Sequence, residues 1–198
     1  MKEWTKEFEL DYWQSHDVDF YHDSVKLKWD LFGAEQALRV LFHNERIDMA
    51  IDIGGGRVGG ALGFIEAENK LLVDALVDEF AVMGDLPIGV VGYCCDFARI
   101  ALSSSIADVV CAWNVFDHAQ NMDHFYQGVQ EAIRLLKDGG VFLGTFPLRS
   151  QPREGHPIAL DVVAVEKAVC ELKLIRFFEV QKPFFDDRII FVMAMKCE

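Results

Sequence analysis

The chain has 198 residues, of which 52% are hydrophobic, so it is long enough for one domain with a sizeable core. Its 32 acidic and 19 basic residues leave a net charge of −13, and this charge, without any Lys/Arg cluster, argues against nucleic acid and anionic membrane surfaces as partners. No apolar run reaches the roughly 18 residues of a membrane span, and the charged amino terminus is unlike a signal peptide, so we expect a cytoplasmic protein without membrane insertion.

The first thirty residues form an aromatic and acidic segment. They hold three of the four tryptophans and eight acidic against four basic residues. Trp4, Phe8 and Tyr12 repeat at four-residue steps, which would place them on one face of a helix. Two interpretations stay open: this face packs on the domain as part of its core, or it closes over a binding pocket as a lid. We expect residues 31–198 to form a single domain.

From residue 34 onward, helix-like and strand-like segments alternate without a linker or repeat, which is typical of one α/β domain. Only seven residues separate the last two predicted strands, too few for a crossover helix, so the last strand should run antiparallel to the rest. The predicted helices span 34–44, 59–67, 122–137 and 158–169, and a glycine cap at 138–140 would close the third of them. The predicted strands span 47–53, 70–76, 89–95, 106–116, 141–146, 172–180 and 188–195.

Five glycines within seven residues follow the first predicted strand. The pattern Gly54-x-Gly56-x-x-Gly59 between a strand and a helix lets the backbone approach a ligand closely. Asp74 ends the second predicted strand, 22 residues after Asp52, where a carboxylate can accept both hydroxyls of a ribose. The pair indicates a nucleoside cofactor, although the glycine pattern alone is weak evidence and a turn without a ligand is the alternative.

Three features favour S-adenosylmethionine over NAD as that cofactor. Asp52 stands just before the glycines, where a carboxylate can interact with an ammonium group directly or through water. The antiparallel last strand is unlike a dinucleotide-binding domain, and no second domain remains to hold a hydride acceptor. An NAD(P)-binding oxidoreductase and a non-catalytic S-adenosylmethionine-binding partner protein remain the alternatives.

Residues 47–146 resemble the class I S-adenosylmethionine-dependent methyltransferases. "AIDIGGGRVGG" resembles their glycine motif, "LLVDALVDEF" their acidic second-strand motif, and "CCDF" the segment that flanks adenine. The block "ADVVCAWNVFDHAQNMDHFYQGVQEAIRLLKDGGVFLGTFP" is similar to the strand-four to strand-five region of small-molecule members. Many members have glycine at the position of Val58, whereas here the glycine comes one residue later, at Gly59.

The resemblance implies a Rossmann-like sandwich with a mostly parallel seven-stranded sheet and an antiparallel last strand. It implies S-adenosylmethionine as cofactor and methyl transfer to a small-molecule or glycan acceptor, with "DIGGG" and "NVFDH" most like methyltransferases of bacterial surface-polysaccharide assembly. Asp74 would hold the ribose, Asp96 and Phe97 would contact adenine, and Asn114 would line the methyl-donor side. The implied cofactor-binding residues are Asp52, Gly54, Gly55, Gly56, Gly59, Asp74, Ala75, Asp96, Phe97 and Asn114.

His118 is the candidate catalytic base. It follows the predicted strand 106–116 at the carboxyl edge of the sheet, and an imidazole titrates near neutral pH. A base is needed only when the acceptor is a hydroxyl or a protonated amine. The alternative is a surface or helix-capping histidine. The other histidines show no metal-ligand spacing and the five cysteines no CxxC spacing, so we expect no metal and reduced thiols.

Overall fold

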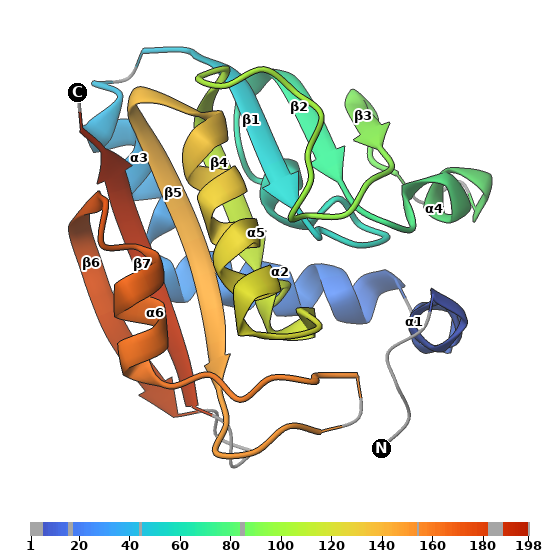
Figure 1. Ribbon diagram of the computed structural model, residues 1–198. Coiled ribbons are helices and arrows are strands. Elements are labelled where there is room, and N and C mark those ends of the chain that lie inside the picture. The colour runs from blue at the N-terminus through green and yellow to red at the C-terminus, as the bar shows by residue number, and fades with distance from the viewer. Residues whose placement is uncertain are drawn as a thin grey trace.

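The computed structural model describes residues 6–15, 18–43, 45–83, 86–153, 155–181 and 188–197. Its centre is a seven-stranded sheet of order β3-β2-β1-β4-β5-β7-β6 (Figure 1). The pairs from β3 to β5 are parallel, whereas β7 runs antiparallel to both β5 and β6. This topology confirms the predicted fold class. The strands are β1 (Ile47–Ile53), β2 (Ala67–Val73), β3 (Val90–Tyr93), β4 (Ala107–Trp113), β5 (Leu136–Leu148), β6 (Leu172–Gln181) and β7 (Arg188–Lys196).

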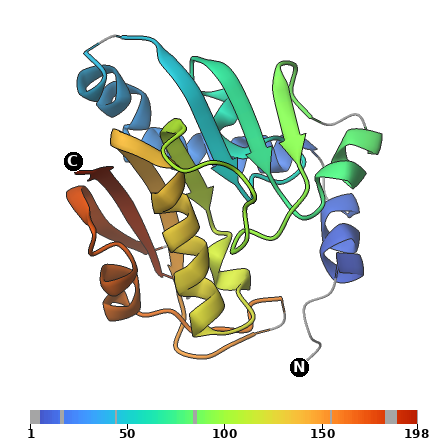
Figure 2. The ribbon, with the colours of Figure 1, turned by 45° about the horizontal axis from the view of Figure 1, so that its top comes forward.

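The sheet is covered on both faces, which explains the apolar sequence of its central strands. Val109, Val110 and Cys111 of β4 are all fully buried although they alternate between the two faces. One core cluster lies beneath α5 (Met122–Leu135) and α6 (Val162–Ala168). The other lies beneath α2 (Val18–Phe32) and α3 (Ala34–Leu41), on the opposite face (Figures 1 and 2).

The amino-terminal segment divides into two helices with different surroundings. α2 packs into the core, because Trp29 is only 3% exposed and Phe32 is fully buried. α1 (Lys6–Gln14) lies instead beside α4 (Val77–Met83), near the ends of β1 and β2 (Figure 2). Of the predicted aromatic face, Trp4 and the side chain of Phe8 lie outside the described residues, and Tyr12 is exposed.

Two predicted helices are wrong in part. The segment 59–67 forms only a 3₁₀ turn, η1 (Gly60–Gly63), because Gly59 and Gly60 both adopt positive φ and β2 already begins at Ala67. The predicted glycine cap of α5 is also absent, since the helix ends at Leu135 and Leu136 is already extended. Among the described residues, no helix is both long enough and apolar enough to cross a membrane.

Candidate functional site

The glycine loop, residues 54–60 after β1, contains four glycines in left-handed backbone conformations. Gly60 is at φ +54°, and a Cβ there would overlap the carboxyl group of Asp52. This position therefore excludes side chains for both conformational and steric reasons. The glycines with positive φ in this loop are Gly54, Gly56, Gly59 and Gly60, while Gly55 packs against Leu72 and the backbone of Gly59 and Gly60.

Asp52 lies beneath this loop as a fully buried carboxyl group. One oxygen, Oδ2, accepts a 2.5 Å hydrogen bond from the backbone N–H of Ala61. The other, Oδ1, is buried with no hydrogen-bond partner among the residues that the structure describes. Burial raises the pKa of Asp52 to about 8, with the Ala61 N–H opposing and the nearby Asp74 adding to the shift. A cation or hydrogen-bond donor beside this unpartnered oxygen would favour the ionised form of Asp52 and would be stabilised by it.

Asp74 connects the end of β2 to the glycine loop. Its carboxylate accepts hydrogen bonds from the backbone N–H groups of Gly56, at 3.1 Å, and Leu76, at 2.8 Å. Burial raises its pKa to about 6, although these two N–H groups oppose the shift. Ala75 lies beside it in the turn that leads to α4. The structure thus brings together Asp52, the glycines and Asp74, as predicted from the spacing.

The next predicted pair, Asp96 and Phe97, follows β3 and faces α5. Asp96 Oδ1 accepts from the N–H of Ala98 and lies 2.9 Å from Nε2 of His124. The Phe97 ring stacks on His124, with centroids 4.6 Å apart, and covers Gly128. Both side chains are therefore already engaged with α5, and their contact with adenine stays a prediction.

Asn114 directly follows β4 in a strained conformation, with φ at +55°. Its backbone N–H and side-chain carbonyl both bond the Thr145 hydroxyl, the latter at 2.7 Å. Thr145 is buried on β5, so this pair ties the ends of two neighbouring strands together. Asn114 therefore lies at the carboxyl edge of the sheet as predicted. Its side chain is bonded to Thr145 there, and these bonds hold the strained backbone in place.

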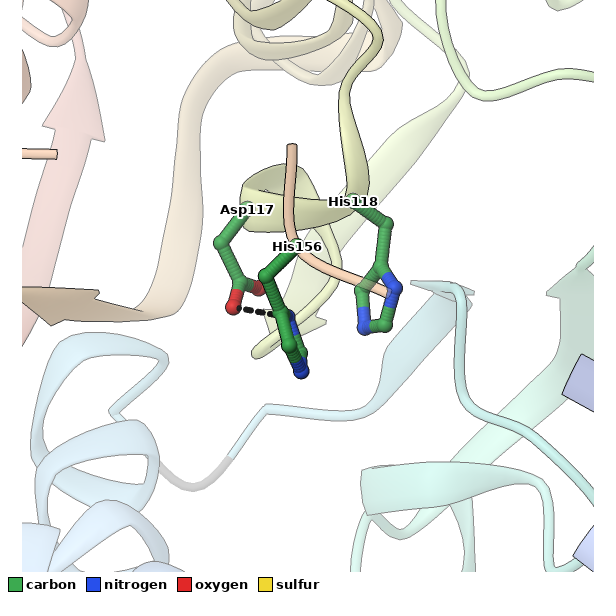
Figure 3. Close-up of side chains that lie close together, drawn as sticks. All are labelled: Asp117, His118 and His156. Carbon is green, nitrogen blue, oxygen red and sulfur yellow. Dashed lines mark ion pairs between the residues drawn. The ribbon is translucent and has the colours of Figure 1, made fainter. Parts of the chain in front are cut away.

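His118 belongs to a cluster that the sequence did not reveal. It lies in η2 (Phe116–His118), and its ring is 4.4 Å from that of His156. Asp117 Oδ2 lies 2.7 Å from Nδ1 of His156 and also contacts the Arg149 guanidinium. Figure 3 shows the two imidazole rings side by side, with the carboxyl group of Asp117 next to His156.

This cluster brings charged side chains together where they are largely buried from solvent. Asp117 and Arg149 are only 1% and 6% exposed. Burial alone would raise the pKa of Asp117, but His156, His118 and Arg149 outweigh it and hold this pKa well below its usual range. Burial lowers the pKa of His156, which the Asp117 carboxylate partly offsets. Asp117 is therefore ionised and His156 neutral at neutral pH.

α1 lies over the glycine loop through the side chain of Trp13. A Cβ on Gly56 would overlap the six-membered ring of Trp13, so the indole rests directly on this glycine. Arg57 of the loop donates a 2.7 Å hydrogen bond to the backbone carbonyl of Trp13. The charge of Glu9, also on α1, contributes to the raised pKa of Asp74. The helix is thus part of the site's surroundings.

Sequence reasoning missed Asp117, Arg149, His156 and Trp13 as neighbours of the predicted site. A signal existed for His156, because "PREGHP" follows β5, and the carboxyl ends of the parallel strands β4 and β5 meet at one edge. No periodicity indicated the contact between Trp13 and Gly56, which joins residues 43 positions apart. It depends on where α1 docks.

The chain has the fold of the class I S-adenosylmethionine-dependent methyltransferases. Among similar solved structures is the N-methyltransferase NodS from Bradyrhizobium japonicum WM9 in complex with S-adenosyl-l-homocysteine, with a TM-score of 0.65 and 12% identity over 82% of this chain and 85% of NodS. A putative methyltransferase from Bacillus halodurans C-125 has a TM-score of 0.63 and 14% identity over 81% of this chain and 99% of its own.

The same fold also carries another reaction. The [4+2]-cyclase SpnF has a TM-score of 0.61 and 14% identity, covering 83% of this chain and 81% of SpnF. No protein-family model and no curated protein sequence matches the chain. Function must therefore be argued from the site, because a fold by itself does not determine the chemistry.

Proposed function

We propose that this protein is an S-adenosylmethionine-dependent methyltransferase. The observation that carries the proposal is the hydrogen bond between Asp74 and the N–H of Gly56, which joins an acidic strand end to a left-handed glycine loop at the carboxyl edge of the sheet. When bound, S-adenosylmethionine supplies an activated methyl group on a positively charged sulfur. The protein's task is then mostly to hold the acceptor in line with that methyl group.

The residues at this edge fit such a cofactor. The orphaned Oδ1 of Asp52 suits an ammonium group, and a glycine loop without side chains leaves room for close backbone approach. In this proposal Asp74 and Ala75 hold the ribose, while Gly54, Gly55, Gly56 and Gly59 flank the methionine end. Asp96 and Phe97 contact adenine, and Asn114 lines the methyl-donor side.

We propose a small molecule or a glycan as acceptor. The net charge of −13 opposes a nucleic acid, and the exposed aromatic rings of Tyr12 and Phe20 suit stacking on flat apolar faces such as those of sugars. NodS is described as an N-methyltransferase. Amines are therefore included among the acceptors to be tested. A role in polysaccharide biosynthesis and a cytoplasmic location belong to this proposal.

The first helix is proposed as a lid. The contact of Trp13 with Gly56 supports this proposal, because the glycine loop is the surface that the cofactor would approach. α2, in contrast, is anchored in the core by Trp29 and Phe32. Closure of α1 alone would exclude water from the reacting groups without unfolding the domain.

Among the residues predicted from the sequence, His118 is the candidate general base. It lies in η2 just beyond the carboxyl end of β4, within electrostatic reach of Asp74. An imidazole in this position would accept the proton of a hydroxyl or protonated amine as the methyl group is transferred. A base role for His118 requires that its replacement with Ala slows the transfer without weakening cofactor binding.

An NAD(P)-binding oxidoreductase is less compatible with the topology, because the antiparallel β7 departs from the parallel order of dinucleotide-binding sheets. Calorimetry with S-adenosylhomocysteine and with NADH separates the two functions. Binding of NADH alone would contradict the proposal. Release of S-adenosylhomocysteine from S-adenosylmethionine in the presence of a panel of amines, phenols and monosaccharides separates an enzyme from a non-catalytic binding protein.

A further inference from the structure

His156 is held in place by its own loop. The backbone N–H and carbonyl groups of Arg153 and His156 bond each other in both directions at 3.0 Å, with Gly155 at φ +74° in the turn. A bond from the N–H of Arg149 to the carbonyl of Leu160 closes the wider loop, and Leu160 is buried. The position of His156 is therefore fixed by local structure as well as by its side chain.

Asp117 gives this imidazole an orientation. Its Oδ2 lies 2.7 Å from Nδ1 of His156, so the carboxylate faces this ring nitrogen, although the alignment falls short of a hydrogen bond in this structure. A carboxylate next to Nδ1 favours the tautomer with its proton there and leaves the lone pair on Nε2. The Arg149 guanidinium contacts the same carboxylate and keeps it ionised.

The neighbouring His118 lacks such an arrangement. Its Nδ1 is buried without a hydrogen-bond partner among the described residues, so nothing there selects one tautomer. His156, 20% exposed, combines an oriented ring with access from solvent. Of the two rings, His156 has the features of a general base.

We propose that His156 is the proton acceptor of the methyl transfer and that Asp117 and Arg149 are its positioning residues. The proposal rests on the proposed function and moves the base from His118 to its neighbour. The acceptor's proton passes to Nε2 of His156, and the electron pair left on the acceptor atom forms the bond to the methyl carbon. The pair of the broken carbon–sulfur bond stays on sulfur, and His156 later releases the proton to solvent.

A divalent metal is the competing occupant of this cluster. One ligand atom from each of Asp117, His118 and His156 lies within 4.8 Å of the others. The Arg149 guanidinium already neutralises the only carboxylate of the three and would repel a second cation. The cluster therefore favours a proton over a metal ion.

Histidine NMR titration of the full chain tests the orientation without an acceptor. The charged groups that act on His156 are Asp117 and His118 from η2 and Arg149 after β5. In wild type, the ring of His156 should carry its proton on Nδ1 and titrate below the usual range. In Asp117→Asn the imidazolium loses its partner, so the His156 pKa should fall further and the two tautomers should mix. The His43→Asn variant is the control, because His43 is an exposed residue with positive φ. In this variant His156 should titrate as it does in wild type.

Kinetics then test the role. With the panel compound that wild type methylates fastest, His156→Gln should reduce the transfer rate by about 10²–10⁴-fold, whereas His118→Gln should reduce it less. Both variants should bind S-adenosylhomocysteine within a few-fold of wild type. Identical His156 titrations in wild type and Asp117→Asn overturn the proposal, as does a wild-type rate in His156→Gln or a shift of the His156 resonances by equimolar Zn²⁺. Failure of wild type to bind S-adenosylhomocysteine instead contradicts the proposed function.

Discussion

Replacing Asp52 with Asn probes the buried carboxyl group under the glycine loop. The amide is nearly isosteric, and its carbonyl oxygen can still accept from the N–H of Ala61. Unlike the carboxyl group, it carries no charge at any pH. The substitution therefore removes one titration and leaves the packing of the loop almost unchanged.

The pKa of Asp52 determines the size and sign of the effect. The folded protein keeps the proton on Asp52 up to about pH 8, whereas the unfolded chain loses it near the ordinary value of 3.8. Between these values the unfolded state binds fewer protons, so the free energy of unfolding of wild type falls as pH rises. At about 1.4 kcal/mol per pKa unit, the loss is on the order of 5 kcal/mol across the window.

Urea unfolding of wild type and Asp52→Asn between pH 4 and 9 measures this difference. Titrations that do not interact with Asp52 are shared by the two proteins, so the difference between their unfolding free energies reports Asp52 together with its coupling to Asp74. We expect Asn to become progressively more favourable than Asp up to about pH 8 and the difference to level off above it. Parallel curves would refute the assignment of a protonated, buried Asp52.

The remaining predictions concern the loop and the helix that covers it. Gly60→Ala should destabilise the fold by at least about 2 kcal/mol, because its Cβ would overlap Asp52 at a positive φ, while Gly63→Ala, whose Cβ meets open space, should unfold like wild type in urea. The fluorescence of wild type should change when S-adenosylhomocysteine binds, and the change should be much smaller in Trp13→Phe; equal changes would show that Trp13 does not face the cofactor. A chain lacking residues 1–17 should bind S-adenosylhomocysteine within a few-fold of wild type by calorimetry but should no longer transfer the methyl group. A cooperative loss of structure in this variant would identify α1 as core.

The sheet was predictable because its signals are local and strong. The apolar run of β4 indicates burial on two faces, and the six residues between β6 and β7 are too few for a crossover helix. The joining of Asp74 to Gly56 was likewise implied by parallel strands that end at one edge. The helix expected at 59–67 failed because two adjacent left-handed glycines interrupt it, which residue spacing does not report.

The rest of the site depends on tertiary placement. Asp117 and His156 are brought together by a loop that folds back after β5, and its closure depends on the backbone bond between Arg149 and Leu160. The docking of Trp13 on Gly56 likewise depends on the packing of α1 against Phe80 of α4. Neither contact is indicated by a periodicity or a residue spacing in the sequence.

Titration of wild type and Asp74→Ala with S-adenosylhomocysteine tests the central claim most directly. Asp74 should provide two charge-assisted hydrogen bonds to the ribose, each worth roughly 1.5–3 kcal/mol, so the variant should bind at least about tenfold more weakly while remaining folded. Wild type that does not bind S-adenosylhomocysteine, or a folded Asp74→Ala variant that binds it with unchanged affinity, would contradict the account.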